Sequence, residues 1–152
     1  MTNVDDIELM TQALTEARLA LAHDDVPVGA VVVVDGKVVA AAHNERELRG
    51  DPTAHAEVLA LRAAAEDVGN SRLDGATLVS TLEPCPMCAG AALMSRVGRV
   101  VFGAEDPKTG SLGSLYNFGA DPRLHHEFQV KARVMQDECG ALLTEFFAAK
   151  RS

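Results

Sequence analysis

The sequence predicts an α/β fold, a three-layer α/β/α sandwich in which helices cover both faces of a central five-stranded mixed sheet. Segments with helical spacing of apolar residues alternate with runs rich in β-branched residues. The Asp35-Gly36 pair between two valine-rich runs is typical of a two-residue hairpin turn. A length of 152 residues is ordinary for one domain, so we treat residues 1–152 as a single domain.

Five segments have the composition of strands. They are residues 28–34, 37–42, 76–82, 99–104 and 128–134. Four other segments place apolar residues three and four positions apart, which predicts helices. They are residues 5–22, 54–68, 84–94 and 136–149. Thr53 is a good N-cap for the second of these helices, and Pro84 suits the first turn of the third.

Two segments between these elements are predicted to be loops. The first is polar and covers residues 43–52, and its charged residues are expected to form a solvated face. These are Glu45, Arg46, Glu47 and Arg49. The second covers residues 106–121 and is rich in glycine. It is long enough that we expect it to have a function.

The composition describes a chain with an aliphatic core. Of its residues 47% are hydrophobic and only 4% aromatic, with no tryptophan. No apolar run approaches the roughly 20 residues that span a bilayer, and the acidic N-terminus lacks the basic start of a signal peptide. Three cysteines with one Cys-x-x-Cys pair are typical of metal or redox chemistry in a reducing compartment. We therefore expect a cytoplasmic protein without a membrane partner.

The net charge of −8 argues against a broad basic surface for nucleic acid. The acidic excess is concentrated in residues 1–25, whereas residues 92–152 are slightly basic. A nucleic-acid partner would therefore meet a local patch in the second half of the chain. Composition alone predicts no such partner.

Two short segments carry the chemistry. His55, Cys85 and Cys88 are good zinc ligands, and the expected helix starts favour the thiolate form of both cysteines. Three protein ligands leave a fourth tetrahedral position for water, which is the pattern of a catalytic zinc. Glu57 follows His55 by two residues, so a helix turns it by about 200° away from the histidine. We expect Glu57 to move protons beside the water rather than to bind the metal.

His55-Ala56-Glu57 followed by Pro84-Cys85-Pro86-Met87-Cys88 resembles the H-x-E…P-C-x-x-C signature of zinc-dependent nucleobase deaminases. More closely, the chain is similar to the bacterial tRNA-specific adenosine deaminases of the cytidine deaminase-like superfamily. The similar segments are residues 26–30, 43–44, 51–57, 81–91, 96–104, 106–110 and 137–139. The resemblance covers nearly the whole chain in order.

The resemblance implies hydrolytic deamination of adenosine to inosine at the wobble position of a tRNA anticodon. It implies zinc-activated hydroxide as the nucleophile, one Zn²⁺ per subunit, no organic cofactor and Glu57 as the proton shuttle. It further implies a homodimer that binds the anticodon stem-loop. By the same match, Asn44 would bind the target nucleotide, and Val28 and Ala30 would line the base pocket. Lys108 and Asp106 would contact the sugar–phosphate backbone, within a loop of residues 106–118 that reads the RNA.

Several alternatives are open at this point. Cys139 could complete a closed structural zinc site, or Cys85 and Cys88 could form a thioredoxin-like redox pair. The same fold could deaminate a free base or nucleoside such as cytosine, guanine or cytidine. A zinc-stabilised interaction module without catalysis is the alternative from another functional class.

The remaining polar residues have simpler interpretations. Cys139 is expected to pack on the apolar face of the last helix, and Glu83 to support or cap the site. Four histidines are expected to be solvated or hydrogen-bonded rather than to bind metal. They are His23 and His43, which flank the presumed pocket, and His125 and His126 in a polar turn.

A small apolar face in the third predicted helix would allow close helix packing. It comprises Ala89, Ala91, Ala92, Leu93 and Met94. This face could pack within one subunit or against a second copy of the chain.

Overall fold

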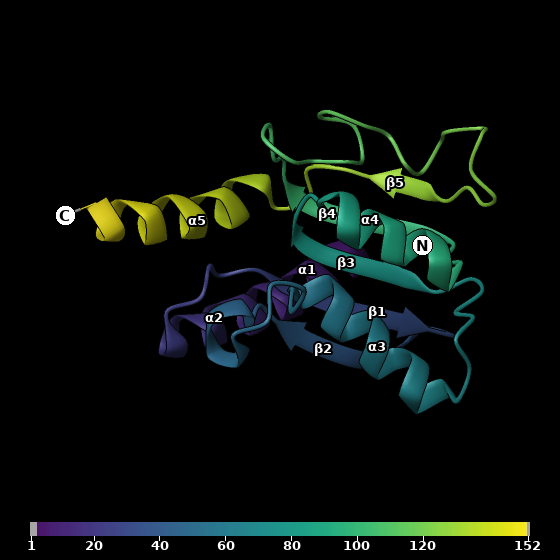
Figure 1. Ribbon diagram of the computed structural model, residues 1–152, viewed down its shortest axis with the longest axis horizontal. Coiled ribbons are helices and arrows are strands. Elements are labelled where there is room, and N and C mark those ends of the chain that lie inside the picture. The colour runs from purple at the N-terminus through teal and green to yellow at the C-terminus, as the bar shows by residue number, and fades with distance from the viewer. Residues whose placement is uncertain (1–2, 152) are drawn as a thin grey trace.

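In the computed structural model, which describes residues 3–151, five strands form one mixed sheet in the order β2-β1-β3-β4-β5 (Figure 1). The strands are β1 (Gly29–Val34), β2 (Lys37–His43), β3 (Thr77–Leu82), β4 (Arg99–Ala104) and β5 (Gln129–Lys131). β1 is antiparallel to both β2 and β3, whereas β3, β4 and β5 are parallel. The predicted five-stranded mixed sheet is confirmed.

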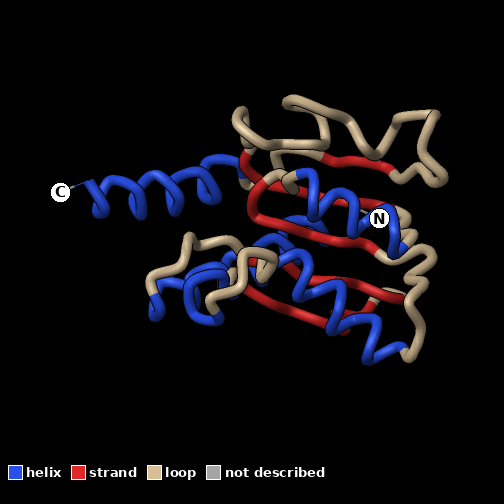
Figure 2. The backbone as a smooth tube through the Cα atoms, viewed as in Figure 1, coloured by secondary structure: helices blue, strands red, loops and turns tan. Residues whose placement is uncertain are grey.

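Helices cover both faces of the sheet, as predicted. They are α1 (Asn3–Leu19) with the 3-10 turn η1 (Ala20–His23), α2 (Arg46–Arg49), α3 (Ala56–Val68), α4 (Pro86–Ser95) and α5 (Gln136–Arg151). Figure 1 shows α3 and α4 in front of the sheet and α1 behind it. Figure 2 shows α5 leaving the sheet at one end and extending away from it.

Alternation along the central strands separates two aliphatic clusters. Val31 lies opposite Val79 and packs under α1, whereas the neighbouring Val32 lies opposite Leu78 and packs under α3 and α4. This follows from the two-residue period of a strand. A Cβ atom at Gly29 would lie 2.0 Å from the carbonyl oxygen of Ala13, so α1 can approach β1 this closely only at a glycine.

Two predicted helix starts are wrong by two residues. α3 begins at Ala56 rather than at residue 54, and Thr53 does not cap it, because its N–H and Oγ1 both donate to Asp51 Oδ1 at 2.8 Å. α4 begins at Pro86, so Pro86 rather than Pro84 occupies the first turn. In both cases an Asx-type turn or a proline competes locally with the helix.

The short helix α2 was not predicted, because its four residues carry no apolar periodicity. The Asp25 carboxylate accepts hydrogen bonds from the N–H groups of Glu47 (2.6 Å) and Leu48 (3.1 Å), so a distant residue stabilises the helix start. β5 is shorter than the predicted strand 128–134. Its flanking Phe128 N–H and Val134 N–H donate instead to Gly119 and Phe102.

Among the described residues, none of the helices combines the length and the apolar character needed to cross a membrane.

Candidate active site

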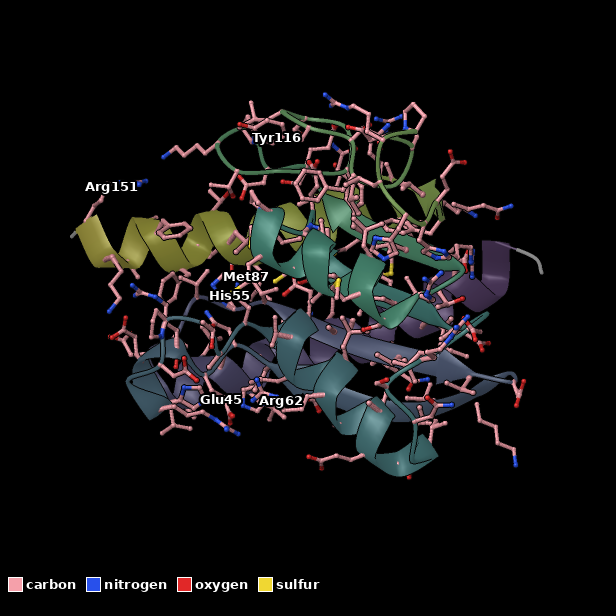
Figure 3. All side chains as sticks on the ribbon, turned by 45° about the vertical axis from the view of Figure 1, so that its right-hand side comes forward. Glu45, His55, Arg62, Met87, Tyr116 and Arg151 are labelled. Atoms are coloured by element: carbon pink, nitrogen blue, oxygen red, sulfur yellow. The ribbon has the colours of Figure 1, made fainter. Side chains whose placement is uncertain are left out.

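The starts of α3 and α4 lie side by side over the end of the sheet and present the three predicted zinc ligands. His55 and Cys85 are the N-cap residues of α3 and α4, with extended backbone angles (φ −76°, ψ 150° and φ −73°, ψ 174°). Cys88 lies in the first turn of α4 and is fully buried. We call His55, Cys85 and Cys88 the thiol cluster. Figure 3 shows His55 and Met87 close together where the two helices begin.

The thiol cluster has the dimensions of a zinc site. The Nδ1 atom of His55 lies 3.6 Å from Cys85 Sγ and 3.4 Å from Cys88 Sγ, and the three donor atoms all lie within 4.8 Å of one another. Zinc bonds of about 2.3 Å to sulfur and about 2.0 Å to nitrogen, at tetrahedral angles, place these atoms roughly 3.5 Å apart. The residues therefore fit this metal without rearrangement.

The protonation of the two thiols is unequal. Hydrogen bonding by Cys88, together with His55, lowers the pKa of the Cys85 thiol to about 4. The hydrogen bond that the Cys88 thiol donates to Cys85, together with burial, raises the pKa of Cys88. The hydrogen bond to Cys85 likewise raises the pKa of His55. A negative charge is thus already stabilised at the cluster, and a bound cation would displace the remaining protons.

Glu57 lines the same pocket as His55 and Cys85, and it is only 4% exposed. Burial raises the pKa of the Glu57 carboxyl to about 7. The expected rotation of about 200° between His55 and Glu57 does not apply, because His55 lies before the first helical residue and has an extended backbone. Both side chains can therefore face one cavity.

A cavity of about 200 Å³ opens above the thiol cluster. Its lining residues are Val26, Val28, Asn44, Arg46, His55, Ala56, Glu57, Leu82, Glu83, Cys85, Asp106 and Thr109. The structure thus brings Val28, Asn44 and Asp106 to the cavity. Ala30 is fully buried in the core beneath α3, and Lys108 is exposed on the loop beyond the lining.

Asn44 closes one side of this cavity and is 8% exposed. Its Nδ2 donates to the carbonyl of Val26 at 3.2 Å, and its Oδ1 accepts from the N–H of Arg46 at 3.1 Å. Asn44 therefore joins the segment before β1 to the segment after β2. The sequence prediction did not include Val26 and Arg46 in the lining, although Val26 belongs to a similar segment and Arg46 follows Asn44 by two residues.

Glu83 organises the glycine-rich loop on the opposite side of the cavity. Its carboxylate accepts hydrogen bonds from the N–H groups of Asp106, Leu112 and Ser114, each at 3.0 Å, and from the Ser114 hydroxyl. A Cβ atom at Gly110 would lie 2.3 Å from the Glu83 Cδ atom, so this contact requires a glycine. The predicted supporting role of Glu83 is confirmed.

Asp106 also accepts hydrogen bonds within this loop. Its carboxylate accepts from the N–H of Lys108 at 3.0 Å and from the Thr109 hydroxyl at 2.8 Å. These bonds form a tight turn that presents Lys108 to solvent. The proposed contacts of Asp106 and Lys108 with a sugar–phosphate backbone stay predictions.

The structure excludes Cys139 from the thiol cluster. Cys139 is 1% exposed and packs in the aliphatic cluster beneath α1. A Cβ atom on Gly103 would lie 2.4 Å from the Sγ atom of Cys139. The predicted packing of Cys139 is confirmed, and the closed zinc site with Cys139 as fourth ligand is wrong. His126 donates to the carbonyl of Val97 and His125 is exposed, which agrees with their prediction.

The fold and this site together define a deaminase, and a family model of MafB19-like deaminases matches residues 4–151. Curated relatives are more specific. The chain is 48% identical to the tRNA-specific adenosine deaminase of Bacillus subtilis strain 168 over 142 residues, which cover 93% of this chain and 88% of that protein. It is 45% identical to the protein of the same name from Haemophilus influenzae over 147 residues, with coverages of 96% and 85%.

Solved structures are also similar to this chain. One from a study of A-to-I editing by tRNA:A34 deaminases at the wobble position of transfer RNA has a TM-score of 0.86 and 43% identity, and covers 90% of this chain and 99% of that one. A guanine deaminase from Nitrosomonas europaea has a TM-score of 0.77 at 27% identity, with coverages of 93% and 84%. The chain belongs to the family of tRNA-specific adenosine deaminases.

Proposed function

We propose that this protein converts adenosine to inosine at the wobble position of a tRNA anticodon, using one zinc ion held by His55, Cys85 and Cys88. The main observation behind the proposal is a cavity of about 200 Å³ that is lined by His55, Cys85, Glu57 and Asn44. This volume lies below the range of about 300–1,000 Å³ for drug-sized ligands and suits one flipped-out base.

The reaction replaces the exocyclic amine of adenine with the oxygen of water. Zinc, when bound, supplies a water whose pKa falls to about 7. The water oxygen forms a bond to C6, the C6–N6 bond breaks, and ammonia leaves. Glu57 takes a proton from the attacking water, delivers it to the ring nitrogen, and carries a proton to the departing amine. A carboxyl with a pKa of about 7 suits both transfers at neutral pH.

The substrate-binding side of the proposal depends on residues at the rim. Asn44 offers an amide to the target nucleotide, and Val28 offers an apolar surface to the base. Ala30 would act indirectly, because it is buried behind this surface. Arg46 at the cavity and the exposed Lys108 provide local positive charge for the RNA backbone despite the net charge of −8. A tRNA substrate would place the protein in the cytoplasm.

A homodimer is the second part of the proposal. Ala89, Ala92 and Leu93 of the predicted packing face are buried within the subunit, but Met94 is 72% exposed. Tyr116 in the glycine-rich loop is 57% exposed. A second copy would cover such exposed side chains. Sedimentation at micromolar concentration should give twice the chain mass, and a monomer would remove this part of the proposal.

The function is tested with an anticodon stem-loop that carries adenosine at the wobble position. We expect inosine from the wild type and a loss of about 10²–10⁴ in rate for Glu57→Ala, with zinc content unchanged. Asp67→Ala, an exposed carboxylate at the other end of α3, is the matched control. Conversion of free guanine or cytosine without conversion of the stem-loop would overturn the tRNA substrate while leaving the deaminase chemistry.

A further inference from the structure

A second group of potential metal ligands lies outside the active-site cavity. His23 ends η1, His43 ends β2, and Glu45 precedes α2. A nitrogen from each ring and a carboxylate oxygen lie within 4.8 Å of one another. The two ring centroids are 5.3 Å apart with an interplanar angle of 30°. We call His23, His43 and Glu45 the imidazole cluster.

Each imidazole is held by a carboxylate through Nδ1. His23 Nδ1 donates to Asp25 Oδ2 at 2.6 Å, and His43 Nδ1 donates to Glu16 Oε1 at 3.0 Å. Because a carboxylate accepts, each contact places an N–H on Nδ1, and in the neutral ring Nε2 then carries the lone pair. Histidines that bind metals in proteins are oriented by carboxylates in this manner.

The two Nε2 atoms have different surroundings. His43 Nε2 lies 3.7 Å from Glu45 Oε2, whereas the other oxygen of Glu45 accepts from Arg49 Nε at 2.7 Å. His23 Nε2 is buried and has no hydrogen-bond partner among residues 3–151. Buried polar atoms in proteins are usually hydrogen-bonded or bound, so this nitrogen is a candidate ligand atom.

Two surface cavities reach residues of the imidazole cluster, one lined by His43 and Glu45 and the other by His23. The first, of about 370 Å³, is lined by Glu16, His43, Glu45, Arg49, Arg62 and Glu66, among others. Figure 3 shows Glu45 and Arg62 on this side of the molecule, below the start of α3. Glu45 already neutralises Arg49, and the carboxylates of Glu16 and Asp25 adjoin the two rings.

We propose that His23, His43 and Glu45 bind a second zinc ion, separate from the one at the thiol cluster. Two imidazoles and one carboxylate are ligands of zinc, and imidazole disfavours magnesium and calcium. Sequence reasoning expected both histidines to be solvated or hydrogen-bonded, because neither belongs to a metal motif. This inference does not depend on the substrate proposed above.

Such an ion would clamp two segments at the rim of the active-site cavity. Val26 and Val28 follow His23, and Asn44 lies between His43 and Glu45. These segments already meet where Asn44 Nδ2 donates to the Val26 carbonyl. Zinc at the imidazole cluster would add a second link between them, beside the residue that we assign to the target nucleotide.

The test is a count of zinc in the full-length protein. Wild type is loaded with zinc sulfate, passed into metal-free buffer containing excess magnesium, and measured by mass spectrometry of the elements. We expect two equivalents per chain in the wild type and in His125→Asn, an exposed control, and one in His23→Asn and in His43→Asn. The single remaining equivalent also shows that each variant has folded around its thiol cluster.

Glu16→Gln provides a second measurement, because it keeps all three ligands and weakens only the support of His43. Calorimetric titration should show the second equivalent about 10–100-fold weaker in this variant. One equivalent in the wild type would overturn the proposal, as would two equivalents in both histidine variants. If a histidine variant does not fold, an unchanged second-site affinity in Glu16→Gln overturns it.

Discussion

The thiol cluster and the imidazole cluster differ in how the chain builds them. The thiol cluster places its donors at the starts of two helices, with His55 and Cys85 as N-caps and Cys88 in the first turn. The imidazole cluster takes its donors from a 3-10 turn, a strand end and a loop residue. Both sets bring three donor atoms within 4.8 Å. Close approach of donors therefore does not require a compact sequence motif.

The difference has a consequence for rigidity and for the effects of substitution. The thiol cluster is tied to the sheet by helices packed on the core beneath them. The imidazole cluster depends on hydrogen bonds between side chains, such as those of Asp25 and Glu16. We therefore expect substitutions at the first cluster to abolish function and those at the second to modulate it.

The largest effect is expected for Cys88→Ala. This change removes a ligand that is fully buried, so the thiol cluster should lose its zinc and inosine formation should fall below detection. His43→Asn should keep measurable inosine formation with a raised KM, because the thiol cluster stays intact. Steady-state kinetics on the stem-loop compare the two. Equal losses in both variants would contradict the difference that we draw between the clusters.

The next effect concerns Glu83, which anchors the glycine-rich loop. Glu83→Gln keeps the shape of the side chain but replaces an acceptor oxygen with a donor amide facing backbone N–H groups. We expect a loss of about 1–3 kcal/mol in the free energy of unfolding, measured by urea denaturation. Glu127→Gln, exposed and near the same loop, should be neutral. No loss in Glu83→Gln would mean that the loop is held by other contacts.

The stability of the fold is expected to depend on pH through Asp25, which supports His23 and the start of α2. Burial alone would raise its pKa, but hydrogen bonds from Glu47, Leu48 and His23 outweigh this, so the folded-state pKa is lowered. A lowered pKa stabilises the fold above the unfolded value of about 3.9, and this contribution is lost as the pH falls through the folded value.

Urea midpoints between pH 6 and pH 3 check this. The wild type should lose more stability over this range than Asp25→Asn, which should already be less stable at pH 6. Asp67→Asn, exposed on α3, should behave as the wild type does. Parallel curves for the wild type and Asp25→Asn would show that Asp25 is not the titrating group.

The smallest effect is expected for Lys108→Ala. Lys108 lies on the turn that Asp106 organises and outside the cavity lining, so its loss should leave zinc content unaltered. Binding of the stem-loop should weaken, and the slope of log affinity against log salt should flatten by about one phosphate contact. Lys37→Ala, an exposed lysine at the start of β2, is the matched control. Identical slopes for wild type and Lys108→Ala would remove this residue from the RNA interface.

Sequence patterns predicted the sheet, its five strands and the two helices that carry the thiol cluster. They did so because valine-rich runs and helical spacing are local features of the sequence, and the fold buries the apolar residues of these segments in the core. They failed at the helix starts, where the Thr53 side chain bonds to Asp51 instead of capping. They also missed α2, because the groups that cap it come from Asp25, more than 20 residues earlier in the chain.

The four residues of the H-x-E…P-C-x-x-C pattern were determined by the sequence itself, because their spacing is local and the helix starts favour thiolates. Only the tertiary structure decided that His55 and Glu57 face one cavity, that Cys139 lies outside the thiol cluster, and that Glu83 holds the loop. It alone brought His23 to His43 and Glu45. Such contacts depend on how α1 packs against β1, and side chains joined only by packing leave no spacing in the sequence by which to find them.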